Sequence, residues 1–252
     1  MNAIFVIARN TFKETIRDRI LYGIAGFSVL YVAFAILLSK VALGDIAILK
    51  SFGLAGMYLF GSVITVFLGS SIISKEIERR TLYFVMAKPV SRSQFVLGKF
   101  FGLCAAVLCV LAVMACVYLV VVSANHGGFD ALGLAAIGYQ ALETVIIFAV
   151  LTFCSVITTP LVSTLIAFMA LFAGHALGSV MASAQRFGGV FLWFVRFVYY
   201  VFPNLEKFDM RGAAAHGISI SASSTAFAVV YAVLYSAAML CLAVAFMKHK
   251  EL

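Results

Sequence analysis

The chain has 252 residues, of which 64% are hydrophobic and 11% are charged, and its mean hydropathy is +1.12. Soluble domains carry about 25% charged residues, so this chain lacks the polar surface that water requires. The composition excludes an ordinary soluble enzyme or binding domain and indicates a protein whose solvent is the lipid bilayer. The net charge of +8 does not imply nucleic acid as a partner, because membrane proteins concentrate Lys and Arg on their cytoplasmic side.

Residues 2–20 predict an amphipathic helix. Ile4, Ala8, Phe12 and Ile16 recur every four residues, and the charged residues of the segment lie off this stripe. A basic helix with one apolar face lies in the membrane interface rather than across it. We therefore expect an interfacial helix over these residues.

Two spans are expected next, at residues 21–38 and 52–74, because each is an apolar run of about the length that crosses a bilayer. A polar island follows at residues 74–99 and holds six Lys and Arg residues between two segments almost free of charge. Within it, Ser91 and Gln94 have the spacing of a capping box at a helix start. The island has the size and composition of a contact surface for another protein. An ordinary basic loop that only fixes orientation is the alternative.

Three further spans are expected at residues 100–122, 132–156 and 161–181, and the last at residues 226–247. Glu143 lies near the middle of the fourth span. Acids inside a membrane are costly and face a partner or a cavity, so Glu143 is a candidate residue of a substrate path. A purely structural contact with a neighbouring side chain is the alternative.

The segment of residues 182–224 is the only long stretch that is not plainly a span. Its apolar part, Phe187–Phe202, contains Arg196 and the only tryptophan, and Pro203-Asn204 follows it. Trp and Tyr favour the membrane interface, so we expect a re-entrant or interfacial helix on the outer side. A seventh span is the alternative, but it would place Arg196 within the bilayer at a cost of about 2.5–3.5 kcal/mol.

Together these elements predict an all-α membrane protein with an N-terminal interfacial amphipathic helix, six transmembrane helices and a re-entrant outer segment before the last span. We expect one transmembrane domain over residues 1–252. With both termini inside, twelve of the eighteen Lys and Arg residues lie on the cytoplasmic side, as the positive-inside rule requires. We therefore expect an integral membrane protein with cytoplasmic termini. The expected membrane is a bacterial inner membrane, although the residues themselves indicate only a membrane.

No catalytic arrangement or metal motif stands out in the sequence. The five cysteines fall within apolar segments without metal-type spacing, and His175 is an isolated histidine in the fifth span. A Gly-x-x-x-x-Gly-Lys-Ser/Thr phosphate loop is absent from these 252 residues. We expect no catalytic residue, no metal and no cofactor in this chain.

The polar island resembles the cytoplasmic loop of type 2 ABC exporter permeases. The shared pattern is E-x-x-x-x-T-L followed by P-V-S-R-x-Q-F-x-x-G-K. The matching residues are Glu76, Thr81, Leu82, Pro89, Val90, Ser91, Arg92, Gly98 and Lys99. The stretch Ile7–Tyr22 also resembles the entry helix of that family, and the order of the elements resembles the family over the whole chain.

This resemblance implies a half-transporter, in which two permease copies, identical or related, work with two separate ATPase subunits that bind ATP and Mg²⁺. By the same resemblance, the island docks on the ATPase. The residues expected to couple are Glu76, Glu78, Arg79, Arg80, Thr81, Leu82, Tyr83, Pro89 and Arg92. The stretch Pro203–Asp209 also resembles that family, which implies a shaped outer element near the exit at Pro203 and Asn204, and a plain turn is the alternative. Arg196, in the re-entrant segment before it, is the third residue expected in this outer element.

The sequence thus predicts the permease subunit of an ATP-driven ABC transporter that acts as an exporter, with lipid, an ATPase and a second permease copy as partners. A secondary transporter is one alternative, but it would favour internal repeats and several buried ionisable groups, and Glu143 is the one acid found near mid-span. A membrane enzyme or an assembly factor without transport activity is the other alternative. The sequence does not indicate the substrate.

Overall fold

The computed structural model describes residues 3–17, 20–41, 46–70, 91–125 and 128–249. Within these ranges the chain is helical apart from its connections, and no strand is present. The elements are α1 (Ala3–Arg17), α2 (Ile20–Val41), α3 (Ile46–Ser70), α6 (Arg92–Ala124), α7 (Ala131–Ile157), α8 (Pro160–Phe187), α9 (Gly189–Val201), the 3₁₀ helix η1 (Glu206–Phe208), α10 (Arg211–Ala215) and α11 (Ala222–His249). The predicted all-α fold is confirmed.

Five helices in the described part of the chain are long and apolar enough to cross a membrane, namely α3, α6, α7, α8 and α11. The expected first span corresponds to α2, a helix of 22 residues. In contrast, α9 has only 13 residues, which is about 20 Å of helix against a hydrocarbon thickness of about 30 Å. This length argues against α9 as a seventh span.

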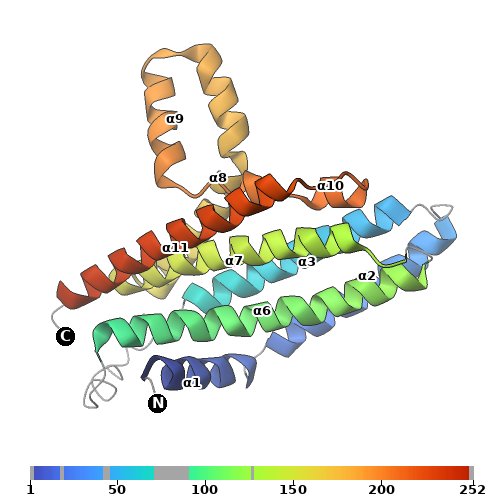
Figure 1. Ribbon diagram of the computed structural model, residues 1–252, viewed down its shortest axis with the longest axis horizontal. Coiled ribbons are helices and arrows are strands. Elements are labelled where there is room, and N and C mark those ends of the chain that lie inside the picture. Colours follow the sequence, from blue (N-terminus) through green and yellow to red (C-terminus); the bar gives the residue numbers. More distant parts are fainter. Residues whose placement is uncertain (1–2, 18–19, 42–45, 71–90, 126–127, 250–252) are drawn as a thin grey trace.

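Figure 1 shows α2, α3, α6, α7 and α11 running side by side in one bundle. The two chain termini lie at the same end of this bundle, where α6 begins and α11 ends. An even number of spans would place both termini on one side of a membrane, and the cytoplasmic position of the termini stays a prediction.

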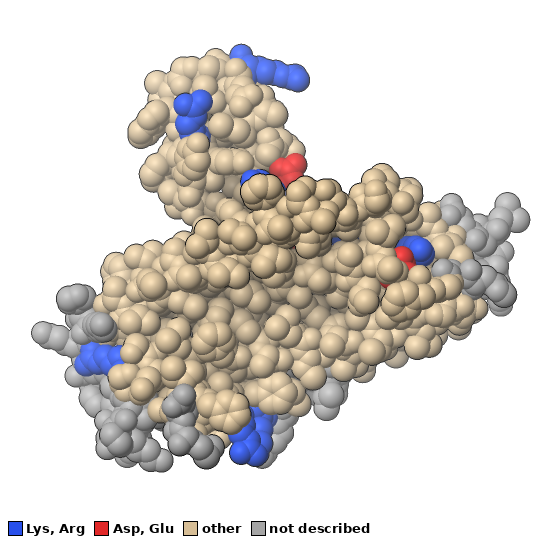
Figure 2. Space-filling model, in the orientation of Figure 1, with Lys and Arg blue, Asp and Glu red and all other residues tan. Residues whose placement is uncertain are grey.

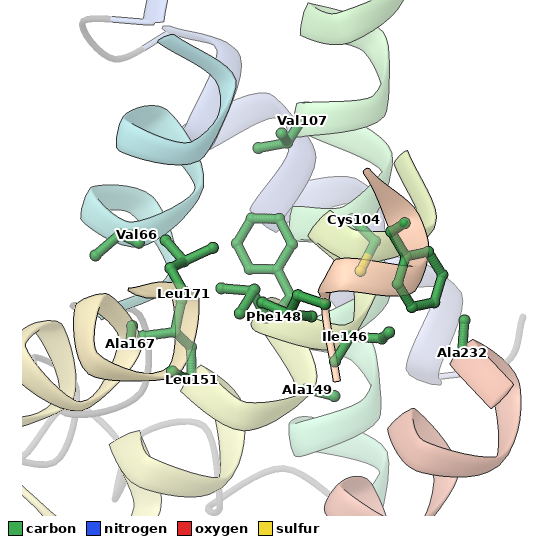
Figure 3. Close-up of a cluster of buried hydrophobic side chains, with 14 of the residues drawn as sticks. Val66, Cys104, Val107, Ile146, Phe148, Ala149, Leu151, Ala167, Leu171 and Ala232 are labelled. Atoms are coloured by element: carbon green, nitrogen blue, oxygen red, sulfur yellow. The ribbon is translucent and has the colours of Figure 1, made fainter. Parts of the chain in front are cut away.

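The central helix of the bundle is α7. Of its most apolar stretch of 18 residues, 72% is buried inside the protein, compared with 22% for the corresponding stretch of α11. Side chains of α7 such as Ile146, Phe148 and Leu151 pack against residues of α3, α6, α8 and α11 in one cluster (Figure 3). Because lipid tails are as apolar as Leu, close packing rather than exclusion from water holds such helices together.

Helix α1 packs along the first turns of α6. A Cβ atom added at Gly98 would lie 2.7 Å from Cβ of Ile7, and one added at Gly102 would lie 2.6 Å from the carbonyl oxygen of Ala8. These two glycines form a GxxxG pair, a spacing that lets helix backbones approach closely. The four residues of the predicted apolar stripe, at positions 4, 8, 12 and 16, are all partly buried. Phe5, directly after the first of them, is 62% exposed.

The C-terminal part of α8 and the whole of α9 form an arm that projects from the side of the bundle (Figure 1). All buried residues of α8 except Ala184 lie between residues 163 and 177, and α9 buries only Val195. The two helices are joined at Gly188 and Gly189, whose φ angles of 65° and 63° suit a residue without a side chain. The predicted helix before Pro203 is thus present, and it pairs with α8.

Between its two ends, the face of the bundle in Figure 2 carries almost no charge. Large apolar side chains are exposed along the bundle. Examples are Phe67, Phe101, Leu161, Phe172 and Phe227. An apolar belt of this kind is what a helix bundle presents to the hydrocarbon core of a membrane.

Candidate functional site

Glu143 is the centre of a buried polar cluster between three helices. Its side chain, on α7, is only 4% exposed. One of its oxygens, Oε1, accepts a hydrogen bond from the hydroxyl of Tyr58 on α3 at 2.9 Å and lies 3.0 Å from Nε2 of His175 on α8. The Tyr58 hydroxyl and His175 Nε2 are themselves 2.7 Å apart. We call these three residues the triad.

The local sequence explains why two members of the triad lie at the same depth. Helices α7 and α8 are joined by the turn at Thr158-Thr159, and Pro160 begins α8 at its first position, where proline needs no hydrogen-bond partner. Glu143 and His175 are each 16 residues from Thr159. Because the two helices run back along each other from this tight turn, equal distances place the two side chains opposite one another.

A charged pair lies beside the triad. The Arg211 guanidinium carbon is 3.9 Å from the centre of the Tyr58 ring, a distance typical of a cation–π contact. The same guanidinium donates two hydrogen bonds of 2.7 Å to the carboxylate of Asp209. These hydrogen bonds hold the pKa of Asp209 below its ordinary value, although partial burial opposes the shift.

A small cavity adjoins the triad and has room for about one water molecule. Six of its eight lining residues carry a side-chain oxygen, although the surface that they turn toward the cavity is mostly apolar. The lining residues are Tyr58, Ser62, Thr65, Gln140, Glu143, Thr144, Ile147 and Leu171. Among the described residues, no group of three or more His, Cys, Asp and Glu side chains could hold a metal ion.

A second polar cluster joins three helices around Asp130, the residue that caps the start of α7. Its carboxylate lies 3.2 Å from Nζ of Lys50 on α3 and accepts hydrogen bonds from the hydroxyl of Tyr118 on α6 at 2.6 Å and from the backbone of Gly133 at 3.1 Å. Asp130 is 4% exposed. With this number of donors, the carboxylate can remain charged although it is buried.

The structure describes only the last part of the predicted docking island. The predicted coupling residues Glu76, Glu78, Arg79, Arg80, Thr81, Leu82, Tyr83 and Pro89 lie outside the described residues. Further on, Ser91 and Gln94 form the predicted capping box, with hydrogen bonds of 3.2 and 3.0 Å. Arg92 is described, and its Nη1 donates to the carbonyl oxygen of Met247 at 2.9 Å. This predicted coupling residue therefore also joins the start of α6 to the end of α11.

Two of the three residues predicted for the outer element lie at the base of the arm. Pro203 and Asn204 are buried. The side-chain amide of Asn204 donates to the hydroxyl of Tyr199 at 2.9 Å, and its backbone nitrogen donates to the hydroxyl of Tyr231 at 3.0 Å. Arg196 is exposed on α9 instead. The structure thus brings the first two together and leaves Arg196 on the surface of the arm.

Sequence reasoning identified Glu143 as a residue that needs a partner, but it treated His175 as isolated and overlooked Tyr58. The equal distances of Glu143 and His175 from the turn at Thr159 are the signal that could have paired them. Nothing comparable in the sequence points to Tyr58, because α3 is not adjacent to α7 or α8 along the chain.

A family model with the description "ABC-2 family transporter protein" matches residues 5–251. The matched range includes the triad, the Asp130 cluster and the predicted docking island. The comparison with curated proteins gives no match.

Proposed function

The chain belongs to the ABC-2 transporter family, and from this premise we propose that it is the permease subunit of an ATP-driven exporter, that it works as a dimer of identical or related chains, and that it couples to separate ATPase subunits. The match over residues 5–251 carries the proposal, because it covers nearly all of the chain. ATP and Mg²⁺ are then bound by the partner, since a phosphate loop is absent from these 252 residues.

In this proposal, the ATPase docks on the island at residues 74–99, and closure of the ATPases moves that segment. The geometry at the start of α6 supports rigid transmission of such a movement. Ser91 caps α6 with a complete capping box, Arg92 bonds to the end of α11, and α1 is packed against Gly98 and Gly102. A displacement of the N-terminal end of α6 is therefore transmitted to α1 and α11, which are attached to it.

The substrate path is proposed to run beside the triad. Glu143 is a buried acid in the central helix, and six of the eight residues that line the neighbouring cavity carry a hydroxyl, amide or carboxylate group. Polar groups at this depth cost free energy unless they have a role or a partner. The proposed location is a bacterial inner membrane. Twelve of the eighteen Lys and Arg residues favour cytoplasmic termini in it.

The experiment is co-purification of the tagged chain from native membranes with its ATPase. Reversing the charges of Glu76, Glu78, Arg79 and Arg80 together with Arg92 should abolish recovery of the ATPase, because the docking surface loses its electrostatic match. The matched control reverses Arg186 and Arg196, two basic residues of the arm, and should leave recovery unchanged. Full recovery of the ATPase with the island variant would contradict the docking role.

A further inference from the structure

The triad carries a charge that its described surroundings do not balance. Asp209 and Arg211 pair with each other through two hydrogen bonds, so their charges cancel, and Tyr58 is neutral. Another acid, Glu206 of η1, lies against Gly178, three residues beyond His175 on α8. The carboxylate of Glu143 therefore remains as an uncompensated negative charge unless His175 is positive or Glu143 itself takes up a proton, and an unpaired buried charge is costly.

Nε2 of His175 lies within hydrogen-bond distance of both other members of the triad. The hydroxyl of Tyr58 has a single proton, which it donates to Oε1 of Glu143. Nε2 of His175 lies 2.7 Å from the Tyr58 oxygen and 3.0 Å from Oε1, so an imidazole that carries its first proton on Nε2 can donate to either oxygen. A second proton, on Nδ1, converts His175 to the imidazolium form and cancels the charge of Glu143.

His175 can exchange this second proton with the surroundings. Its side chain is 22% exposed, and histidine is the side chain whose charge ordinarily changes between pH 5 and 8. Among the histidines that the structure describes, His175 alone takes part in the cluster. A proton that binds here forms one N–H bond at Nδ1 and comes from water, so no further reactant is needed.

The triad also lies where α8 leaves the bundle. Apart from Ala184, the buried residues of α8 end at Leu177, two residues beyond His175. The backbone beside the triad is also fixed to the base of the arm, since Gly174 accepts a hydrogen bond from the backbone nitrogen of Leu205 at 3.1 Å. The contact between His175 and Glu143 therefore helps to hold α8 in place at the base of the arm.

We propose that the triad is a proton-binding site that controls the arm formed by α8 and α9. With the proton bound, an imidazolium–carboxylate pair holds α8 against α3 and α7. When the proton leaves, the pair weakens and the root of the arm is released. This inference goes beyond the ATPase-driven role and does not depend on it.

Trp193 gives a direct measurement, because it is the only tryptophan of the chain and lies on α9 with 71% of its surface exposed. The full-length chain is reconstituted alone in phosphatidylcholine nanodiscs, and Trp193 emission is recorded between pH 5 and 8. The wild-type emission maximum should shift with the profile of a single proton. His175→Gln and Glu143→Gln should each lose this shift, and the control His216→Gln, at an exposed histidine next to α10, should keep it.

Thermal unfolding of the same samples provides the second measurement. A protonated histidine paired with a carboxylate stabilises the fold at acid pH, and this contribution is lost as the pH rises. The wild-type Tm should therefore fall between pH 5 and 8, and the Tm of Glu143→Gln should not. A flat wild-type Tm and emission profile overturns the proposal, even if a variant fails to fold. So does a shift of Trp193 that persists in His175→Gln. Because the ATPase is not in the sample, either result leaves the docking proposal to its own test.

Discussion

At the scale of single residues, Asp130 shows how this chain stabilises a buried charge. The carboxylate receives Lys50 from α3, the hydroxyl of Tyr118 from α6 and a backbone nitrogen of α7. Each donor belongs to a different helix, so the carboxylate joins three helices at a single point. Removing one donor leaves a buried carboxylate with an incomplete set of partners, which costs more than the loss of an ordinary hydrogen bond.

Tyr118→Phe should lower the free energy of unfolding by about 1.5–3 kcal/mol, the range for hydrogen bonds to charged groups. The matched control is Tyr139→Phe, because Tyr139 is equally buried but bonds to the neutral hydroxyl of Thr225 at 2.9 Å. An interhelical hydrogen bond of that kind is worth about 0.6 kcal/mol in a membrane. Denaturant titration of the purified protein in detergent measures both values, and equal losses would refute the special role of Asp130.

The triad marks the limit of prediction at this scale. Glu143 could be recognised because an acid within an apolar span needs an explanation. Its pairing with His175 depends on the register of the α7–α8 hairpin, which is defined by the turn before Pro160. Tyr58 could not be foreseen, since its approach depends on how α3 is rotated about its axis, and an apolar span with several polar residues does not reveal that rotation.

At the scale of helices, hydropathy located the spans well and their ends less well. The predicted third span begins at Phe100, but α6 begins eight residues earlier, at Arg92. The second predicted span begins at Phe52, whereas α3 starts at Ile46 and includes Lys50. Hydropathy identifies only the part of a helix that lies within the hydrocarbon core. A helix can extend beyond that core into polar sequence where a cap or a neighbouring helix supports its end.

Gly102→Ala should destabilise the contact between α1 and α6, because the new Cβ would lie 2.6 Å from a backbone oxygen of α1. Overpacking of this kind costs about 1–3 kcal/mol. Gly138→Ala in α7 is the matched control, since a Cβ there meets nothing within 4 Å, and alanine favours a helix by about 1 kcal/mol over glycine. Limited proteolysis of α1 and thermal unfolding report the difference. A Gly102 variant as stable as the Gly138 variant would show that α1 does not depend on this close packing.

At the scale of the whole molecule, the arm is the feature that sequence could not predict. The apolar composition of Phe187–Phe202 is compatible with a helix in the interface, in the bilayer or against a protein, because all three environments accept the same side chains. The structure pairs α9 with α8 and leaves most of its large side chains exposed, Trp193, Phe194 and Phe197 among them. In the proposed dimer, we expect this arm to contact the second copy.

Truncation of two arm residues, Trp193→Ala with Phe194→Ala, should weaken dimerisation by about 1.4 kcal/mol or more, which is about tenfold in Kd. Recovery of an untagged copy with a tagged copy, at several protein-to-lipid ratios, measures this change. Phe227→Ala is the control, because Phe227 is 76% exposed on α11 and faces away from the core without belonging to the arm. Equal dimer fractions for the arm variant and the wild type would exclude the arm as the contact.

The unbroken course of α6 has a mechanical consequence. Its 33 residues form a rod of about 50 Å, gripped by α1 near one end through Gly98 and Gly102 and pinned near the other by the bond from Tyr118 to Asp130. A continuous helix of this length moves as a rigid body about its contact with α1. If the proposed docking displaces the N-terminal end of α6, the helix carries that displacement to Asp130 at its other end. The stiffness of one helix can therefore connect the two faces of the membrane.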